Sequence, residues 1–302
     1  ELAAFNALPA ALSEDMWTHQ YDQQSNQIAC EKFPGKSFFR TNGSEAHLFG
    51  LEPNFGCCTA NFNQGWPKFA LSSFMHCNHT VVNVLPVPSE LKTDRFSVKL
   101  QTEYPFKNEF QYVIDSETEF EFIVRIPSFA EGLMVNGNNV DTQALKFKIT
   151  PCHHRIIKIS YKTSPILIPR PHGLATAKCG SLIFSLPIKY EKKMHEYTRD
   201  DVERKFPYCD YELIPQSAWN YAFAGNRMEV RRCTLGNFPF SEQNPPVIIK
   251  IRAVQINWGL ADGYETVCDK TPRSRVPIRD PEPVELIPYG CAKLRMTEMP
   301  TM

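Results

Sequence analysis

Apolar and polar residues alternate with a period of two along much of the chain after about residue 80. Successive side chains of a β-strand point to opposite faces, so this alternation is typical of half-buried antiparallel strands. It is clear in RFSVKLQ at 95–101, EFEFIVRI at 119–126, LKFKI at 145–149 and RIIKISY at 155–161. Further strands are predicted at SLIFSLPI (181–188), VIIKIRAVQINW (247–258) and CAKLRMTE (291–298).

The first 80 residues have a different pattern and are predicted to be helical with loops. Leucine and phenylalanine recur at helical spacing at the start of the chain, which predicts a helix over about 1–12. Another helix is predicted from about Pro67, because proline is well tolerated in the first turn of a helix. The charged stretch KYEKKMHEYTRDDVERKF at 189–206 is predicted to be a solvated loop or an exposed helix.

These two patterns predict a mixed α and β protein with three domains. Residues 1–80 would form a helical domain, 81–165 a β-sandwich, and 166–302 a second β-sandwich-like domain. The chain opens within a helical pattern, without an initiator methionine or the layout of a signal peptide. We therefore interpret it as the C-terminal part of a longer protein, and its cellular compartment is left open.

Composition excludes several classes of function. The 302 residues carry 33 basic and 33 acidic side chains. No basic stripe of the kind that binds phosphate is present, so a nucleic-acid partner is not expected. No apolar run of about 18 residues occurs, so no membrane span is expected. Ten cysteines in a chain of this length are too sparse for a disulfide scaffold.

Two cysteines are adjacent in FGCCTANFNQGWPKFA at 55–70, and they carry the most specific chemistry in the sequence. Adjacent cysteines are awkward to join in a disulfide. Two thiolates, Cys57 and Cys58, would instead make half of a tetrahedral zinc site, and a thiolate is also a nucleophile. The nearby candidates for further ligands, none at a recognised spacing, are His19, Cys30, His47, Glu52, His76 and Cys77. The alternative is a pair of small buried hydrophobic residues at a tight turn.

The sequence segments around this pair resemble those of glycoside hydrolase family 127, the β-L-arabinofuranosidase family. They are, in order, FNALPAALSEDMWTHQYDQQSNQ, GLEPNFGCCTANFNQGWPKFA, RIPSFAEGLMVNG and VELIPYGCAKLRMTEMP. The resemblance covers essentially the whole chain, as the C-terminal half of a family member. The Cys-Cys-x-x-Asn element that begins at Cys57 is its most specific part.

The resemblance implies the terminal helices of an (α/α)6 barrel followed by antiparallel β-sandwich domains. It also implies a Zn2+ ion held by Cys57, Cys58 and a Glu-x-Cys element. In that family the first cysteine of the pair is the nucleophile of a retaining hydrolase, so Cys57 would have both roles. The implied substrate is an oligosaccharide or glycan with a terminal L-arabinofuranose or related sugar, and a homodimer is left open.

The sequence departs from the family pattern at two points. No Glu-x-Cys element precedes Cys57 in this sequence. The remaining zinc ligands and the acid/base carboxylate are expected upstream of Glu1. The fragment alone is therefore expected to be inactive. Thr59 and Ala60 stand where characterised members often have two prolines, which indicates a separate subgroup and leaves the exact sugar open.

Polar side chains in the loop before residue 27 are the predicted substrate-binding groups. Tyr21, Gln20 and Gln24 would direct a hydroxyl and two amides at sugar oxygens. The alternative is a polar loop that binds its own backbone. For the whole protein, two rivals to hydrolysis stay open. One is a non-catalytic carbohydrate-binding or structural β-sandwich protein, and the other keeps the cysteine pair as a structural zinc or redox site.

Overall fold

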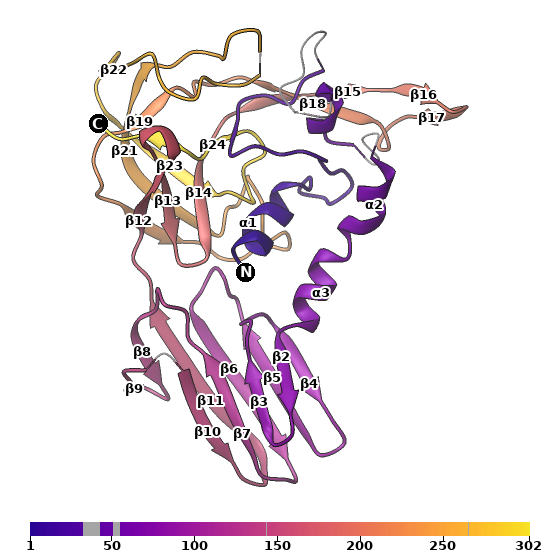
Figure 1. Ribbon diagram of the computed structural model, residues 1–302, viewed down its shortest axis with the longest axis vertical. Helices are drawn as coiled ribbons and strands as arrows, with labels where there is room; N and C mark the ends of the chain where they lie inside the picture. The colour runs from indigo at the N-terminus through magenta and orange to yellow at the C-terminus, as the bar shows by residue number, and fades with distance from the viewer. Residues whose placement is uncertain (33–42, 51–54, 143, 265) are drawn as a thin grey trace. The chain divides into compact units, whose positions relative to one another are not determined.

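The computed structural model describes residues 1–32, 43–50, 55–142, 144–264 and 266–302. Contacts within the chain divide it into two compact units, whose elements are labelled in Figure 1. The first unit contains Glu1 and residues 63–164, and the second contains residues 2–62 together with 165–302. The division into domains at residues 80 and 165 stays a prediction.

The first unit is built on two β-sheets. A six-stranded sheet has the order β4-β5-β6-β11-β8-β9, and a four-stranded sheet has the order β10-β7-β3-β2. Their strands pair antiparallel, except that β3 runs parallel to β7. The elements are α3 Gly65–Leu71, β2 Phe74–Cys77, β3 Thr80–Asn83, β4 Ser89–Lys92, β5 Phe96–Thr102, β6 Glu109–Ser116, β7 Phe120–Arg125, β8 Glu131–Val135, β9 Asn138–Asn139, β10 Ala144–Ile149 and β11 Cys152–Lys162.

The period-two alternation of this unit produces a core between its two sheets. Along β6 and β7 every second residue is buried. Phe96 of the six-stranded sheet stacks on Phe120 of the four-stranded sheet, with ring centroids 4.6 Å apart. Tyr112 and Phe122 meet edge to face at 5.1 Å. Apolar faces that pack against each other in this way define a β-sandwich, as the alternation predicted.

The same core holds one buried polar group that depends on a single hydroxyl. Asn83 is 1% exposed, and its Nδ2 donates to the carbonyl oxygens of Ser73 and Leu85 at 3.0 and 3.1 Å. Its Oδ1 accepts a hydrogen bond of 2.7 Å from the hydroxyl of Tyr112, which is fully buried. The amide is therefore satisfied only while that hydroxyl is present.

The substitution Tyr112→Phe is expected to lower the free energy of unfolding by about 1–2 kcal/mol, because it leaves a buried amide oxygen without a donor. Chemical denaturation of the two proteins measures the difference. Tyr221→Phe is the matched control, since that hydroxyl donates to Glu282 at the exposed surface. A loss at position 112 no larger than that at position 221 would contradict the assignment.

The second unit is built around a larger sheet. Among the described residues this sheet has eleven strands, six of them in the order β1-β24-β14-β23-β21-β19. The two-stranded pairs β15-β18 and β16-β17 lie outside it. The elements are α1 Leu2–Ala10, β1 Asn26–Gln27, the 3-10 helix η1 Ser44–His47, α2 Gly56–Phe62, β12 Ile166–Arg170, η2 Pro171–Gly173, β13 Leu174–Cys179, β14 Leu182–Pro187, β15 Tyr190–His195, β16 Tyr197–Arg199, β17 Val202–Arg204, β18 Asp210–Pro215, β19 Tyr221–Phe223, β20 Glu229–Arg232, β21 Val247–Asn257, β22 Ser274–Pro277, β23 Glu282–Pro288, β24 Arg295–Met296 and β25 Met299–Pro300.

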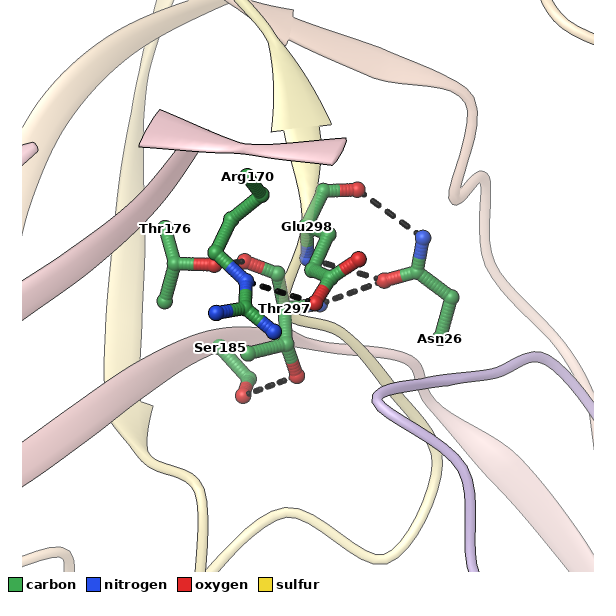
Figure 2. A network of polar contacts seen from close by, with 6 residues as sticks. All are labelled: Asn26, Arg170, Thr176, Ser185, Thr297 and Glu298. Atoms are coloured by element: carbon green, nitrogen blue, oxygen red, sulfur yellow. Dashed lines mark hydrogen bonds and ion pairs between the residues drawn. The ribbon is translucent and has the colours of Figure 1, made fainter. Parts of the chain in front are cut away.

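The N-terminal segment of the chain is part of this second unit. The short strand β1 pairs antiparallel with β24, about 270 residues further along the chain. Figure 2 shows how the Asn26 side chain reinforces this pairing: its Oδ1 accepts from the backbone N–H groups of Thr297 and Glu298, both at 2.9 Å. Its Nδ2 donates back to the carbonyl oxygen of Glu298 at 2.9 Å. The Asn26 amide therefore forms hydrogen bonds to the backbone beyond β24 of the kind that a further residue of β1 would form.

The helix α1 is held to the same sheet by a buried asparagine. The Nδ2 of Asn6 donates to the carbonyl oxygen of Ser181 at 2.9 Å, and its Oδ1 accepts from the backbone N–H of Ile183 at 2.9 Å. The predicted helix over 1–12 is thus present, shortened to Leu2–Ala10. The predicted helix from Pro67 begins slightly earlier, at Gly65, and a separate helix α2 precedes it.

The charged stretch at 189–206 was predicted wrongly. It forms β15, β16 and β17 rather than a loop or a helix, and β15 pairs with β18. The β16-β17 hairpin turns at Asp200 and Asp201, whose φ angles are 51° and 59°. Aspartate is one of the few residues other than glycine that tolerates this conformation, so two adjacent aspartates are a hairpin signal that charge alone conceals.

None of the helices formed by the described residues combines the length and the apolar character that a membrane crossing requires.

Candidate functional site

The cysteine pair lies in the first turn of α2. The carbonyl oxygen of Phe55 accepts hydrogen bonds from the backbone N–H groups of Cys58 and Thr59, at 2.9 and 3.1 Å, which starts the helix. Asn61 donates from Nδ2 to the carbonyl oxygen of Cys57 at 2.6 Å. Cys57 is exposed and Cys58 is half-buried. The alternative of two small buried hydrophobic residues at a tight turn stays a prediction.

The spacing of the two sulfurs matches one edge of a zinc site. The Sγ atoms of Cys57 and Cys58 are 3.6 Å apart. A Zn–S bond of about 2.3 Å and tetrahedral geometry place two thiolate sulfurs about 3.8 Å apart. Within the described ranges, no group of three or more His, Cys, Asp or Glu side chains is arranged to hold a metal ion. The pair fits two of the four ligands, and Glu52 lies outside the described residues.

The other candidate ligands have different contacts. Cys30 is fully buried and accepts a hydrogen bond from Gln20. The ring of His47 contacts the carbonyl oxygen of Glu31 at 2.7 Å. His76 and Cys77 lie on β2, in the first unit. All ten cysteines of the chain are free thiols.

Tyr21 is the predicted substrate-binding residue that lies beside the pair. Its ring stacks on that of Phe55, with centroids 3.8 Å apart and planes 10° apart. The negative charge that Cys58 carries when ionised, and a hydrogen bond to the same sulfur, raise the pKa of the Tyr21 hydroxyl. The pKa of the Cys58 thiol is also raised, by desolvation first and then by Cys57. A metal ion or another cation would reverse this effect, because it stabilises the thiolate.

Gln20 and Gln24 occupy different environments. Gln20 is 3% exposed, and its Nε2 donates to the carbonyl oxygen of His47 at 2.6 Å. Its Oε1 accepts a hydrogen bond from the Gln27 side chain. Gln24 is half-buried, and its backbone carbonyl oxygen accepts a hydrogen bond from Nε of Arg295 at 3.0 Å. Substrate binding by either residue stays a prediction.

His19 braces α2, a role that sequence reasoning missed. Its Nε2 lies 3.2 Å from the Thr59 hydroxyl, and its ring stacks on Phe62 with centroids 5.8 Å apart. Its backbone exchanges two hydrogen bonds with Gly50, at 2.9 and 3.1 Å. Burial lowers the pKa of the imidazole, so the neutral ring is favoured. No local sequence signal predicts this contact, because His19 is distant in the sequence from Thr59 and Phe62.

The buried residue His47, whose carbonyl oxygen accepts the hydrogen bond from Gln20, predicts a pH dependence of stability. The residue is 2% exposed, and burial lowers its pKa below the ordinary value despite the hydrogen bond to the carbonyl of Glu31. As the pH falls below about 6.5, the unfolded chain takes up a proton that the folded imidazole resists. The contribution of His47 to stability is therefore present above that pH and is lost on acidification.

We expect the free energy of unfolding to fall less between neutral pH and about pH 5 in His47→Gln than in the wild type. Urea denaturation at both pH values measures the two differences. His153→Gln is the control, because the side chain of His153 is 95% exposed. Equal pH dependence in the wild type and in His47→Gln would show that the buried imidazole does not resist protonation.

Comparisons with known proteins show what this fold resembles. No protein-family model matches the sequence, and no curated protein matches it. Among solved structures, a family 127 β-L-arabinofuranosidase from Geobacillus stearothermophilus T6 is 15% identical, with a TM-score of 0.61 over 99% of this chain. A protein described only as a glycoside hydrolase is 13% identical, with a TM-score of 0.59 over 98%. A further family 127 β-arabinofuranosidase is 14% identical, with a TM-score of 0.55 over 99%.

The chain therefore shares its fold with part of these glycoside hydrolases. It spans 45%, 47% and 44% of their lengths. The predicted resemblance to family 127 is confirmed as a similarity of fold, because sequence identity is low in each case.

Proposed function

We propose that this chain belongs to a retaining glycoside hydrolase that resembles zinc-dependent β-L-arabinofuranosidases, with Cys57 as nucleophile. The observation that carries the proposal is the pair of accessible thiols, 3.6 Å apart at the start of α2. It lies on a chain whose fold resembles part of a protein described as a family 127 β-L-arabinofuranosidase and part of another described as a family 127 β-arabinofuranosidase. The proposed substrate is a glycan with a terminal L-arabinofuranose or a related sugar.

In this proposal Cys57 and Cys58 would hold a zinc ion, which would keep both thiols deprotonated at neutral pH. The Sγ of Cys57 attacks the anomeric carbon, and an S–C bond forms as the bond to the leaving oxygen breaks. A carboxylic acid protonates that oxygen. Water then displaces the sulfur, and the carboxylate takes the proton of the water, which gives net retention.

The residues around the pair would orient it. The hydrogen bond from Asn61 to the Cys57 carbonyl would hold the first turn of α2. The contact between the His19 ring and the Thr59 hydroxyl would hold the residue that follows the pair. Tyr21 would direct its hydroxyl to Cys58 or to a sugar hydroxyl, with its ring fixed by Phe55. A nucleophile held in this way needs little rearrangement before it attacks.

The rest of the site would come from residues outside this chain. Neither α2 nor α3 has a buried residue, although both contain aromatic side chains, and Leu71 is 82% exposed. Such helices are expected to be covered by neighbours. We propose that they belong to an (α/α)6 barrel whose remaining helices supply the other zinc ligands and the acid/base carboxylate. This chain alone would then be inactive.

Hydrolysis of a chromogenic β-L-arabinofuranoside by the natural protein in its full length tests the proposal, together with its zinc content. We expect about one zinc ion per chain, hydrolysis with retention, and loss of both on chelation. Glycan binding without turnover would favour the non-catalytic carbohydrate-binding alternative. Loss of folding on chelation, with no hydrolysis at any stage, would favour a structural zinc site. Either result overturns the proposal.

A further inference from the structure

The sequence contains two Asn-x-Ser/Thr triplets, the acceptor sequence for N-linked glycans. They are Asn42-Gly-Ser44 and Asn78-His-Thr80, and neither belongs to the proposed hydrolytic site. Asn42 lies outside the described residues, and Ser44 is buried in η1. The second triplet lies wholly within the described residues, on the β2-β3 hairpin of the first unit.

Asn78 lies at the tip of this hairpin (Figure 1). The pairing of β2 with β3 ends at Cys77 and Thr80, so the two residues between them form a tight turn. The φ angle of Asn78 is 53°, in the left-handed region that asparagine tolerates better than most residues. The carbonyl oxygen of His79 accepts a hydrogen bond of 2.8 Å from the backbone N–H of Glu121, which fixes the turn to its sheet.

The two side chains that define the triplet are available for modification. Asn78 is exposed, and Thr80 is half-buried. Among the residues that the structure describes, neither the Asn78 side-chain amide nor the Thr80 hydroxyl has a hydrogen-bond partner. A glycan on Nδ2 of Asn78 would therefore break no hydrogen bond of the fold. Bulky, solvated groups of this kind are found at surface positions.

A second hairpin of the same unit differs in the chemistry of its third residue. Asn136 is exposed at the turn between β8 and β9, and its φ angle is 48°. Its Oδ1 accepts from the backbone N–H of Lys158 at 2.8 Å. Gly137 and Asn138 follow it, so the hydroxyl that an acceptor triplet needs is missing. The two turns thus share exposure and backbone conformation, and only the turn at Asn78 has the acceptor sequence.

An apolar row on the outer face of the four-stranded sheet lies beside the Asn78 turn. Met75, Val82 and Ile123 are neighbours in register across β2, β3 and β7. Met75 is 56% exposed, and the other two side chains are half-buried. Exposed apolar surface on a sheet favours association with other chains. Met75 is three residues before Asn78, about 10 Å along the strand, so a hydrophilic glycan at the turn would hinder such association.

We propose that Asn78 carries an N-linked glycan. In the transfer, Nδ2 of Asn78 forms a bond to C1 of the first sugar as the bond from C1 to a lipid diphosphate breaks. The lipid diphosphate leaves, and the amide gives up one proton. The enzyme is an oligosaccharyltransferase, which requires the hydroxyl of Thr80 in its acceptor. The proposal goes beyond the proposed hydrolysis and does not depend on it, and it implies that the protein passes through a compartment that holds this enzyme.

Mass spectrometry of the natural protein in its full length tests the proposal. Enzymatic release of N-linked glycans in H₂¹⁸O converts each glycosylated asparagine into an ¹⁸O-labelled aspartate. The label is expected at position 78 and not at position 136. A peptide that contains Asn78 and is found only without the label would overturn the proposal. Hydrolysis of a glycoside is not part of this measurement, so its outcome is independent of the proposed function.

Three variants of the full-length protein, produced in its natural host, separate the site from the compartment. Thr80→Val is expected to lose the glycan and Thr80→Ser to keep it, because either hydroxyl residue completes the triplet. Asn138→Thr creates an acceptor triplet at Asn136 and is expected to add a second glycan. A glycan at position 136 in this variant with none at Asn78 would show that the protein meets the enzyme and that Asn78 is not its acceptor. No glycan at either position would show that the protein does not meet the enzyme. Either result, or a glycan that persists in Thr80→Val, overturns the proposal.

Discussion

Replacing Cys57 by serine in the full-length protein is expected to lower kcat/KM for a β-L-arabinofuranoside by about 10⁴-fold or more, since the proposed mechanism uses this residue as its nucleophile. A serine hydroxyl is far less ionised than a thiol at neutral pH. The change replaces one sulfur atom by a smaller oxygen atom at an exposed position, so the fold should be retained. Initial rates with the chromogenic substrate, alongside circular dichroism, make the measurement.

Two further cysteine variants show whether the effect belongs to nucleophilic attack. Cys58→Ser is expected to weaken zinc binding first, so that part of its activity returns at high zinc concentration. Cys77→Ser changes another exposed thiol, on β2, and should have wild-type activity. If Cys57→Ser keeps most of its turnover, the cysteine is not the nucleophile. If it loses activity only in proportion to bound zinc, Cys57 is a ligand alone.

The largest expected effect on stability lies at Arg295. This side chain is fully buried, and its Nε donates to the carbonyl oxygen of Gln24 at 3.0 Å. One terminal nitrogen donates to the carbonyl oxygen of Ala292 at 2.9 Å, and the other donates to the Tyr289 hydroxyl at 2.9 Å. The guanidinium also lies 4.1 Å from the centroid of the Tyr289 ring. It thus joins the N-terminal loop to the C-terminal strands.

Arg295→Met is expected to lower the free energy of unfolding by about 3–5 kcal/mol, because several buried acceptors lose their donor at once. Arg295→Lys should recover only part of the loss, since an ammonium cannot reproduce the planar arrangement of donors. Urea denaturation measures both. Hydrogen exchange of the amides at 24–27 should rise in Arg295→Met, since this loop loses the hydrogen bond from the guanidinium to the Gln24 backbone carbonyl and keeps only those of β1 and Asn26.

Arg170→Met is the matched control. Arg170 forms an ion pair with Glu298 at 2.9 Å, with 44% of its side chain exposed (Figure 2). Exposed pairs of this kind contribute about 0–1 kcal/mol. If Arg295→Met destabilises the protein no more than Arg170→Met does, the buried guanidinium is not what holds the N-terminal loop in place.

Local spacing in the sequence was enough to predict four strands of the first unit, β5, β7, β10 and β11. In β5 the apolar residues Phe96, Val98 and Leu100 are two positions apart, and each is buried. A period of two depends only on the geometry of a single strand, so it can be recognised without knowledge of the partner. The cysteine pair could also be recognised, because two adjacent thiols followed by an asparagine form a motif that is itself local.

Long-range partners could not be predicted in the same way. The parallel pairing of β3 with β7 and the antiparallel pairing of β1 with β24 join segments whose composition contains no trace of each other. The burial of Gln20 depends on partners that are distant in the chain, because its Nε2 donates to the carbonyl oxygen of His47. The hydrogen bonds of its amide to His47 and Gln27 have no local signal in the sequence.

The sequence by itself determined the β-sandwich part of the fold, the position of the thiol pair and the resemblance to a hydrolase family. Only the tertiary structure decided that the N-terminal loop belongs with the C-terminal strands and that Arg295 is buried between them. The physical reason is that strand periodicity arises from neighbouring residues. Burial, hydrogen-bond partners and cavities arise from residues that are distant in the chain and close only in the folded state.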